Sequence, residues 1–94
     1  MPKIEEIKAK AVPILKAAGA SRAALFGSYA KGNATSKSDI DILVELPDHL
    51  SLLDFVGIQL DLEDMLDTKV DLVEYDAIKP DLKQYILKDL VSLI

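Results

Sequence analysis

The chain has little of what marks secreted, zinc-binding or membrane proteins. Among its 94 residues there is no cysteine and no tryptophan, and there is one histidine. The absence of cysteine excludes disulfide bonds and every zinc site that uses thiolate ligands. No apolar run approaches the roughly 20 residues that a membrane helix needs, and no secretory leader is visible. We therefore expect a cytoplasmic protein that has no membrane partner.

Basic residues are also scarce. The chain has 11 lysines and arginines against 16 aspartates and glutamates, which gives a formal net charge of -5. Binding to a nucleic-acid backbone relies on clustered lysine and arginine, and no such cluster is visible. We therefore expect no direct binding to nucleic acid.

What the chain does contain is typical of a globular protein. Half of its residues are apolar and 29% are charged, which is enough apolar material for one core. Helical and strand periods alternate along the sequence, and the length favours a single domain over residues 1–94. This order favours an α/β or α+β fold whose helices pack on one face of a small sheet. The expected helices cover Lys3–Ala18, Ser28–Lys31, Ser51–Leu66 and Asp81–Leu90, and the expected strands cover Arg22–Phe26, Asp39–Leu46 and Lys69–Val73.

Several local signals refine these elements. Pro13 removes a backbone donor inside the first helix, so we expect a kink or a break there. Ser28 is a natural N-cap for the short helix, and Ser51 with Asp54 resembles a capping box. The last four residues, VSLI, are apolar and predict either a final turn or a short edge strand.

Two aspartates, Asp39 and Asp41, stand in a segment that otherwise has the pattern of a strand, although aspartate is a poor strand former. Residues two apart on a strand share a face at a Cα spacing of about 7 Å. Alternation places Ile40, Ile42, Val44 and Leu46 on one face and Asp39, Asp41, Leu43 and Glu45 on the other. The acidic face is either simply hydrated or bound to a cation.

A third carboxylate, Asp71, lies between apolar neighbours in the next expected strand, KVDLV. Taken alone, an Asp-x-Asp pair favours a hydrated face, and Asp71 weakens that interpretation. Three ionised carboxylates without a cation would repel one another and raise their pKa values. Mg²⁺ prefers oxygen ligands and commonly binds one or two carboxylates together with substrate phosphates. The sequence does not tell whether the two strands are neighbours.

A glycine–serine turn, Gly27–Ser28, lies between the first strand and the short helix. Such a turn presents backbone N–H groups to anions, and glycine allows a phosphate to approach closely. An ordinary capped turn is the competing interpretation. A phosphate cradle followed by an acidic strand provides the two halves of a nucleotidyl-transfer site.

These residues resemble the nucleotidyltransferase superfamily that includes DNA polymerase β. Its signature is an apolar residue, Gly, Gly or Ser, a loop, and then Asp-apolar-Asp, which correspond here to Phe26–Ser28 and Asp39–Asp41. The segments GSYAKG and SDIDILV are similar to the motifs of the minimal nucleotidyltransferase (MNT) group, and KVDLV matches the strand of the third carboxylate. The resemblance covers about Ile4 to Leu90 and implies a small mixed sheet.

The resemblance implies a role for each matching residue. Lys31 stands where the motif usually has arginine, so the charge is kept and the bidentate fork is lost. Asp71 would complete the metal site or help to deprotonate the acceptor hydroxyl. The implied catalytic and metal-binding residues are Asp39, Asp41 and Asp71, and the implied nucleotide-binding residues are Gly27, Ser28, Lys31 and Ser38.

By the same resemblance, MNT proteins are antitoxins that pair with a HEPN-type toxin and transfer AMP from ATP to a tyrosine of that toxin, with two Mg²⁺ ions. The chain has no room for a substrate domain, so the acceptor would arrive on another molecule. The alternative is an antitoxin that binds and masks its partner without catalysis. A transferase acting on small molecules is a third hypothesis, against which the missing substrate domain argues. Homo-oligomers and hetero-oligomers both stay open.

Three further residues are ambiguous. Arg22 is either a triphosphate contact or a surface residue, and Tyr29 either packs or stacks on a base. Glu45 shares the acidic face but lies at the far end of the strand, so we leave it outside the site.

Overall fold

A four-stranded mixed sheet forms the centre of the protein, in the order β3-β2-β1-β4. The computed structural model describes residues 2–94. Along the chain the elements are α1 (Ile4–Ala17), β1 (Arg22–Phe26), α2 (Gly27–Lys31), β2 (Ile40–Glu45), α3 (Leu52–Leu66), β3 (Val70–Glu74), a 3-10 turn η1 (Tyr75–Ala77), α4 (Pro80–Ile86) and β4 (Val91–Ser92). None of the helices in residues 2–94 is long and apolar enough to span a membrane.

Strand directions follow from the connections. β1 pairs antiparallel with both β2 and β4, whereas β2 pairs parallel with β3. A parallel pair needs a crossover between its strands, and α3 provides it. The expected fold class and the mixed sheet are confirmed. The apolar C-terminal residues form an edge strand, which is one of the two expected outcomes.

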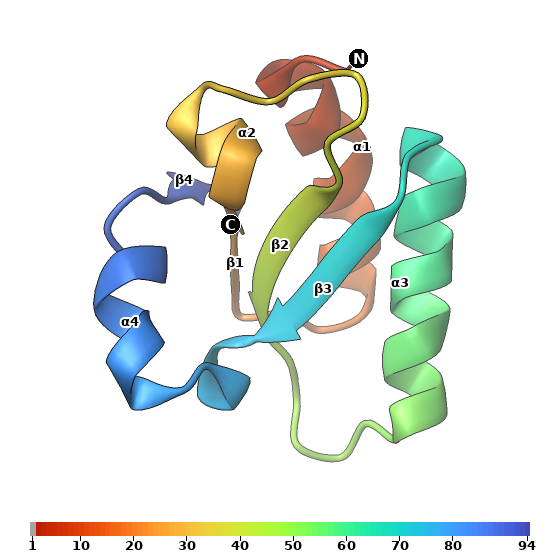
Figure 1. Ribbon diagram of the computed structural model, residues 1–94. Coiled ribbons are helices and arrows are strands. Elements are labelled where there is room, and N and C mark those ends of the chain that lie inside the picture. The colour runs from red at the N-terminus through yellow and green to blue at the C-terminus, as the bar shows by residue number, and fades with distance from the viewer. Residues whose placement is uncertain (1) are drawn as a thin grey trace.

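Two long helices, α1 and α3, pack side by side over one face of the sheet (Figure 1). Ile40, Ile42 and Val44 face the core as expected and are fully buried, whereas Leu46, expected on the same face, follows the end of β2 and is only partly buried. Burial of this apolar face is the main source of stability for such a fold. The core cluster includes Ile7, Ala11 and Leu15 of α1, Ile40, Ile42 and Val44 of β2, and Ile58, Leu62 and Leu66 of α3.

Part of the opposite sheet face is also apolar. Leu43 alternates with the aspartates, as expected, but its side chain is fully buried. Its register neighbour Ala24 and also Ile78, which follows η1, are buried outside the main core cluster. The open, polar part of this face is therefore confined to particular positions along β2, one of which is Asp41.

Some local expectations are wrong. Of the kink or break expected at Pro13, the break is wrong, because α1 is continuous through this exposed residue, and the carbonyl of the exposed Ala9 can bond water in place of the missing donor. A kink there stays a prediction. The N-cap of α2 is Phe26 and not Ser28, and no side chain caps this helix. α4 ends at Ile86 and not near residue 90. It buries none of its residues, and a helix without a buried face gains little stability from tertiary packing.

Other local expectations are confirmed. The Ser51 hydroxyl accepts a hydrogen bond from the Asp54 N–H at 3.2 Å, and the Asp54 carboxylate accepts one from the Ser51 N–H at 2.9 Å. The pKa of Asp54 is lowered first by the bond from the Ser51 N–H, which favours the ionised carboxylate, and then by the nearby Ser51 hydroxyl. The capping box therefore fixes the start of α3, the helix that connects β2 to β3.

Candidate functional site

The parallel pairing of β2 and β3 sets Asp41 directly beside Asp71. Neighbouring strands lie about 4.8 Å apart, and register partners point to the same side of the sheet. Asp39 lies just before β2, two residues from Asp41. The structure thus brings together the three carboxylates that were singled out in the sequence (β2 and β3 in Figure 1).

Asp41 has a perturbed pKa. Its pKa is raised from 3.8 to about 6, first by burial and then by the negative charges of Asp71 and Asp39. Both causes disfavour the charged form of the carboxylate. An acidic site with this surplus of negative charge attracts cations.

A partial counter-charge reaches the site from Lys69. Its Nζ lies 3.9 Å from Oδ2 of Asp39, and both side chains are substantially exposed. Exposed ion pairs contribute at most about 1 kcal/mol, so this contact can be exchanged for another at small cost. Lys69 precedes β3 directly and enters the site with Asp71.

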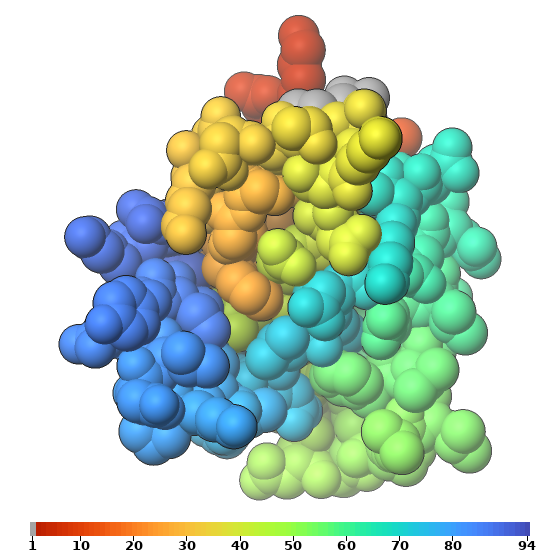
Figure 2. Space-filling model, viewed as in Figure 1, coloured from red at the N-terminus to blue at the C-terminus, as the bar shows by residue number. Residues whose placement is uncertain are grey.

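Gly27 holds the turn against Asp41. Its φ is +70°, and a Cβ built there would collide with the Oδ2 atom of Asp41. Only glycine adopts this backbone readily and leaves the space free. The N-terminal turn of α2, with Ser28, therefore lies directly against the carboxylate that carries the raised pKa, and Figure 2 shows the α2 segment (orange) beside β2 (yellow-green). The proposed phosphate cradle and the acidic cluster are thus in contact.

Lys31 and Ser38 flank the loop that joins α2 to β2. Lys31 is the exposed last residue of α2. The Ser38 hydroxyl accepts a hydrogen bond from the Thr35 N–H at 2.9 Å, which closes the loop on itself. This bond gives Ser38 a structural role in the loop. Contact of Lys31 or Ser38 with a nucleotide stays a prediction.

The carboxylates fit a hard cation only in part. No three His, Cys, Asp or Glu side chains within residues 2–94 form a ready-made metal-binding group. Asp39 is directed toward Lys69, whereas Asp41 and Asp71 are paired across the strands. Mg²⁺ needs only one or two carboxylates when substrate phosphates supply further ligands. The residues therefore fit a cation that binds together with a triphosphate.

A different arrangement occupies the far end of β1 and β2. The Arg22 guanidinium lies 3.4 Å from the Glu45 carboxylate and stacks over the Tyr75 ring, 3.9 Å from its centroid. The Ser21 hydroxyl donates a hydrogen bond to Glu45 at 2.7 Å. Four residues, or about 13 Å of strand, separate Glu45 from Asp41. Arg22 is therefore placed away from the carboxylate cluster, and Tyr75 had no signal in the sequence.

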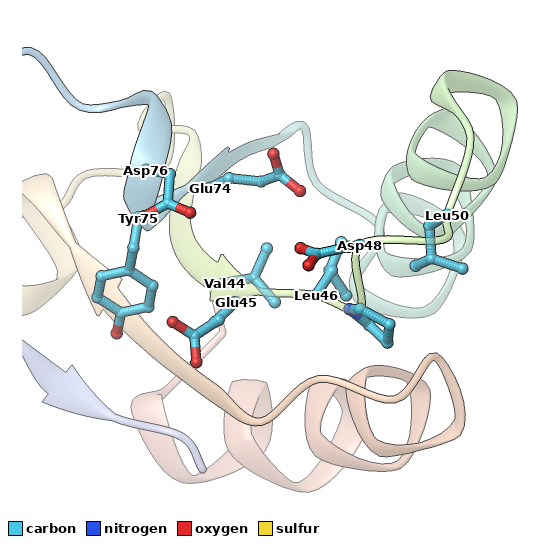
Figure 3. Close-up of a pocket in the computed structure, with 9 residues that line it drawn as sticks. Val44, Glu45, Leu46, Asp48, Leu50, Glu74, Tyr75 and Asp76 are labelled. Carbon is cyan, nitrogen blue, oxygen red and sulfur yellow. The ribbon is translucent and has the colours of Figure 1, made fainter.

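A surface pocket lies at this far end, between the β2–α3 connection and η1 (Figure 3). Carboxylates from both segments surround it, namely Glu45, Asp48, Glu74 and Asp76. Figure 3 shows these carboxylates projecting from both sides of the hollow. Glu45 is already bonded to Arg22 and Ser21, and none of the residues predicted to bind nucleotide or metal lines this pocket, so we do not assign the nucleotide to it.

Tyr29 is buried in the core cluster and packs there, which is one of its two expected roles.

Comparison with known proteins agrees with this geometry. Residues 5–93 match the model of the nucleotidyltransferase domain family. The chain is 46% identical over 91 residues to MJ0435 of Methanocaldococcus jannaschii, which carries the name of a protein adenylyltransferase, with 97% of this chain and 98% of the relative covered. It is 37% identical over 73 residues to the protein adenylyltransferase MntA of Thermococcus cleftensis, with 78% and 74% covered.

Solved structures give the same result. A structure described as a minimal nucleotidyltransferase superposes with a TM-score of 0.81 at 31% identity, covering 96% of this chain and 95% of that chain. A toxin-antitoxin complex with AMP-PNP gives a TM-score of 0.80 at 29% identity, covering 93% and 72%. A Shewanella oneidensis complex of a tri-AMPylated HEPN toxin with an MNT antitoxin gives 0.74 at 26% identity, covering 96% and 71%. The chain belongs to the nucleotidyltransferase domain family, in its minimal form.

Proposed function

We propose that this chain is a Mg²⁺-dependent protein adenylyltransferase that transfers AMP from ATP to a tyrosine of a HEPN-type partner toxin. The observation that carries the proposal is the pairing of Asp41 with Asp71 beside the Gly27 turn. Relatives named as protein adenylyltransferases, and solved complexes of MNT antitoxins with HEPN toxins, support the same reaction and partner.

In this reaction the tyrosine oxygen attacks the α-phosphorus of ATP. A new P–O bond forms, the bond to the bridging oxygen breaks, and pyrophosphate leaves with the electron pair. Bound Mg²⁺ would neutralise the triphosphate and help to orient the reacting oxygens. Asp39 and Asp41 would hold the metal, and Asp71 would complete its ligand set or accept the phenolic proton.

The turn at Gly27 and Ser28 would bind the phosphates. The first backbone N–H groups of a helix have no partner within it, and α2 begins at Gly27, where the missing Cβ keeps the backbone close to Asp41. Phosphate and carboxylate would then share one cation across this contact. Lys31 at the end of α2 and Ser38 at the end of the loop would add contacts to the nucleotide.

The test is the intact mass of the protein encoded by the neighbouring gene, after co-expression with this chain. We expect an increase of one or more AMP units with the wild type and none with the Asp39→Ala/Asp41→Ala variant. Glu45→Gln is the matched control, because Glu45 is an acid on the same strand and face but at the far end. A partner that stays unmodified with the wild type contradicts the proposal.

Masking of the toxin without catalysis is the second candidate. Large apolar side chains exposed on α3 favour a binding role. The Asp39→Asn/Asp41→Asn variant separates the two functions. Neutralisation of the toxin that survives this double substitution would favour masking, whereas neutralisation that fails, with the complex still formed, would favour catalysis.

A further inference from the structure

The outward face of α3 carries a row of exposed apolar side chains. Leu52 and Leu53 are 77% and 83% exposed, and Leu60 and Val56 are 55% and 40% exposed. Residues at this helical spacing lie along one side of the helix. We call these four residues the outer stripe. Because the opposite side of α3 is buried through Ile58, Leu62 and Leu66, the helix is apolar on two sides.

A shallow groove between α1 and α3 continues the outer stripe. It is lined by Ile14 and Ala17 of α1, by Ala18 at the end of that helix, and by Leu53, Gly57 and Ile58 of α3. The two helices stand side by side in Figure 1. Small residues leave the groove open between larger apolar neighbours. A groove of this kind is suited to the apolar face of an amphipathic helix.

Gly57 adds an independent observation. A glycine inside an exposed helix costs about 1 kcal/mol relative to alanine. A Cβ at Gly57 would meet no atom of the protein within 4 Å, so packing inside the chain does not require glycine. Its absent side chain leaves open space beside Leu53 in the groove. This is the arrangement that close approach of another molecule requires.

The charge of α3 indicates what that molecule is. The helix has four acidic residues and no lysine or arginine, and the acids are Asp54, Asp61, Glu63 and Asp64. Asp54 and Asp61 line the groove together with His49, and no lysine or arginine is among its lining residues. The surface is therefore apolar with an acidic border. Its complement is apolar with a basic border.

A second copy of this chain fits less well. Two α3 helices related by a twofold axis would place acidic borders against each other. Because no lysine or arginine lines the groove, the basic groups of a second copy would have to come from outside it, as Lys79 and Lys83 beside α4 would in a head-to-tail contact. Head-to-tail contacts generate rings or filaments.

We propose that the outer stripe and the α1–α3 groove dock an amphipathic helix of the protein acceptor, with an apolar stripe bordered by lysine and arginine. The identity of that acceptor rests on the proposed function. α3 covers the core face of the sheet, whereas Asp41 lies on the opposite face. A helix docked on α3 therefore leaves the carboxylates accessible to a tyrosine from another segment of the partner.

The experiment measures the affinity of the purified partner for variants of this chain by calorimetry, and the KM and kcat of AMP transfer. Leu53→Gln and Leu60→Gln remove apolar contacts, and glutamine keeps the helix propensity of leucine. We expect each to weaken binding about tenfold and to raise the KM for the partner, with kcat unchanged. Leu82→Gln is the matched control, because Leu82 is exposed on α4 outside the stripe.

Two further variants test the groove and the border. Gly57→Leu fills the groove while improving helix propensity, so the chain should become more stable to urea and yet bind the partner about tenfold more weakly. Asp61→Lys should weaken binding and reduce its dependence on salt. A general structural defect would lower stability and affinity together, which separates it from docking.

The outcomes that overturn the proposal are distinct from failure of the proposed function. Unchanged affinity of the Leu53, Leu60 and Gly57 variants overturns docking on α3, even where AMP transfer proceeds normally. Absence of any complex with the wild type overturns it as well. Self-association of this chain that Leu53→Gln abolishes identifies a second copy as the occupant and also overturns it. Stripe-dependent binding without AMP transfer supports docking and rejects only the transferase.

Discussion

The two ends of strand β2 carry carboxylates on the same face in opposite states. At one end, Arg22 and the Ser21 hydroxyl bond Glu45 directly. At the other end, Asp41 lies beside Asp71, and its pKa is raised to about 6 by burial and by neighbouring negative charge.

This difference shows that a carboxylate on a sheet face does not by itself define a binding site. Glu45 is satisfied within the chain, so its position needs no ligand. Asp41 is held against another acid by the strand register and against a glycine turn by close packing. Negative charge that the fold gathers without balancing marks the end where a cation and phosphates would bind.

The largest expected effect is a loss of AMP transfer that substitutions at the Asp41 end of β2 cause and a substitution at the Glu45 end does not. Asp39→Asn/Asp41→Asn should lower AMP transfer by about a thousandfold or more, because the charges that would hold the metal are lost. Glu45→Gln should leave the rate within about threefold, since it lies outside the site. Rates come from the appearance of AMP-modified partner by mass spectrometry. Equal losses in both variants would erase the distinction between the ends.

A comparison of two glycines tests how closely the turn packs on the Asp41 end of β2. Gly27 and Gly32 both have positive φ, at +70° and +79°, but only a Cβ at Gly27 would collide with Asp41. Gly32→Ala should therefore cost about 1 kcal/mol of unfolding free energy, and Gly27→Ala about 3 kcal/mol. Urea denaturation measures both values. Equal costs would mean that the turn moves away from Asp41 easily.

Stability as a function of pH tests the surplus charge directly. The folded chain binds the Asp41 proton more tightly than the unfolded chain, so this contribution is full below pH 3.8 and is lost as pH rises through about 6. In EDTA at pH 7, Asp41→Asn should be more stable than the wild type by about 1 kcal/mol, after allowance for solvent screening. The difference should vanish below pH 3.8. A wild type that is the more stable at pH 7 would show that Asp41 is already neutralised.

The smallest expected effect concerns the Glu45 end of β2, where the carboxylate is paired with Arg22. Arg22→Gln removes the ion pair with Glu45 and the stacking on Tyr75. These groups are partly exposed, so the loss should be about 0.5–1 kcal/mol, measured by thermal or urea unfolding. AMP transfer should stay unchanged. A strong loss of activity would instead connect this end to the nucleotide.

Much of the fold was predictable because its signals are local. Alternation in β2, the capping box at Ser51 and the apolar spacing of α1 and α3 each follow from near neighbours in the sequence. The motif spacing also singled out Asp39, Asp41 and Asp71 before their arrangement was known.

What could not be predicted depends on long-range packing. The sequence gives no register for Asp41 and Asp71, and it does not reveal that Gly27 is needed for the clearance of Asp41. Burial of Leu43 likewise depends on the covering of the second sheet face. The prediction of Ser28 as the N-cap was wrong because α2 already begins at Gly27, which has a positive φ.

The parallel pairing of β2 and β3 also has a kinetic consequence. Asp41 and Asp71 are 30 residues apart in the chain (71 − 41), and α3 must cross the sheet before they meet. Contacts of such high sequence separation are costly to close and typically form slowly. The acidic pair is thus completed only once β3 has docked. Recovery of AMP transfer during refolding should therefore lag behind the return of helical signal and report the final assembly of the sheet.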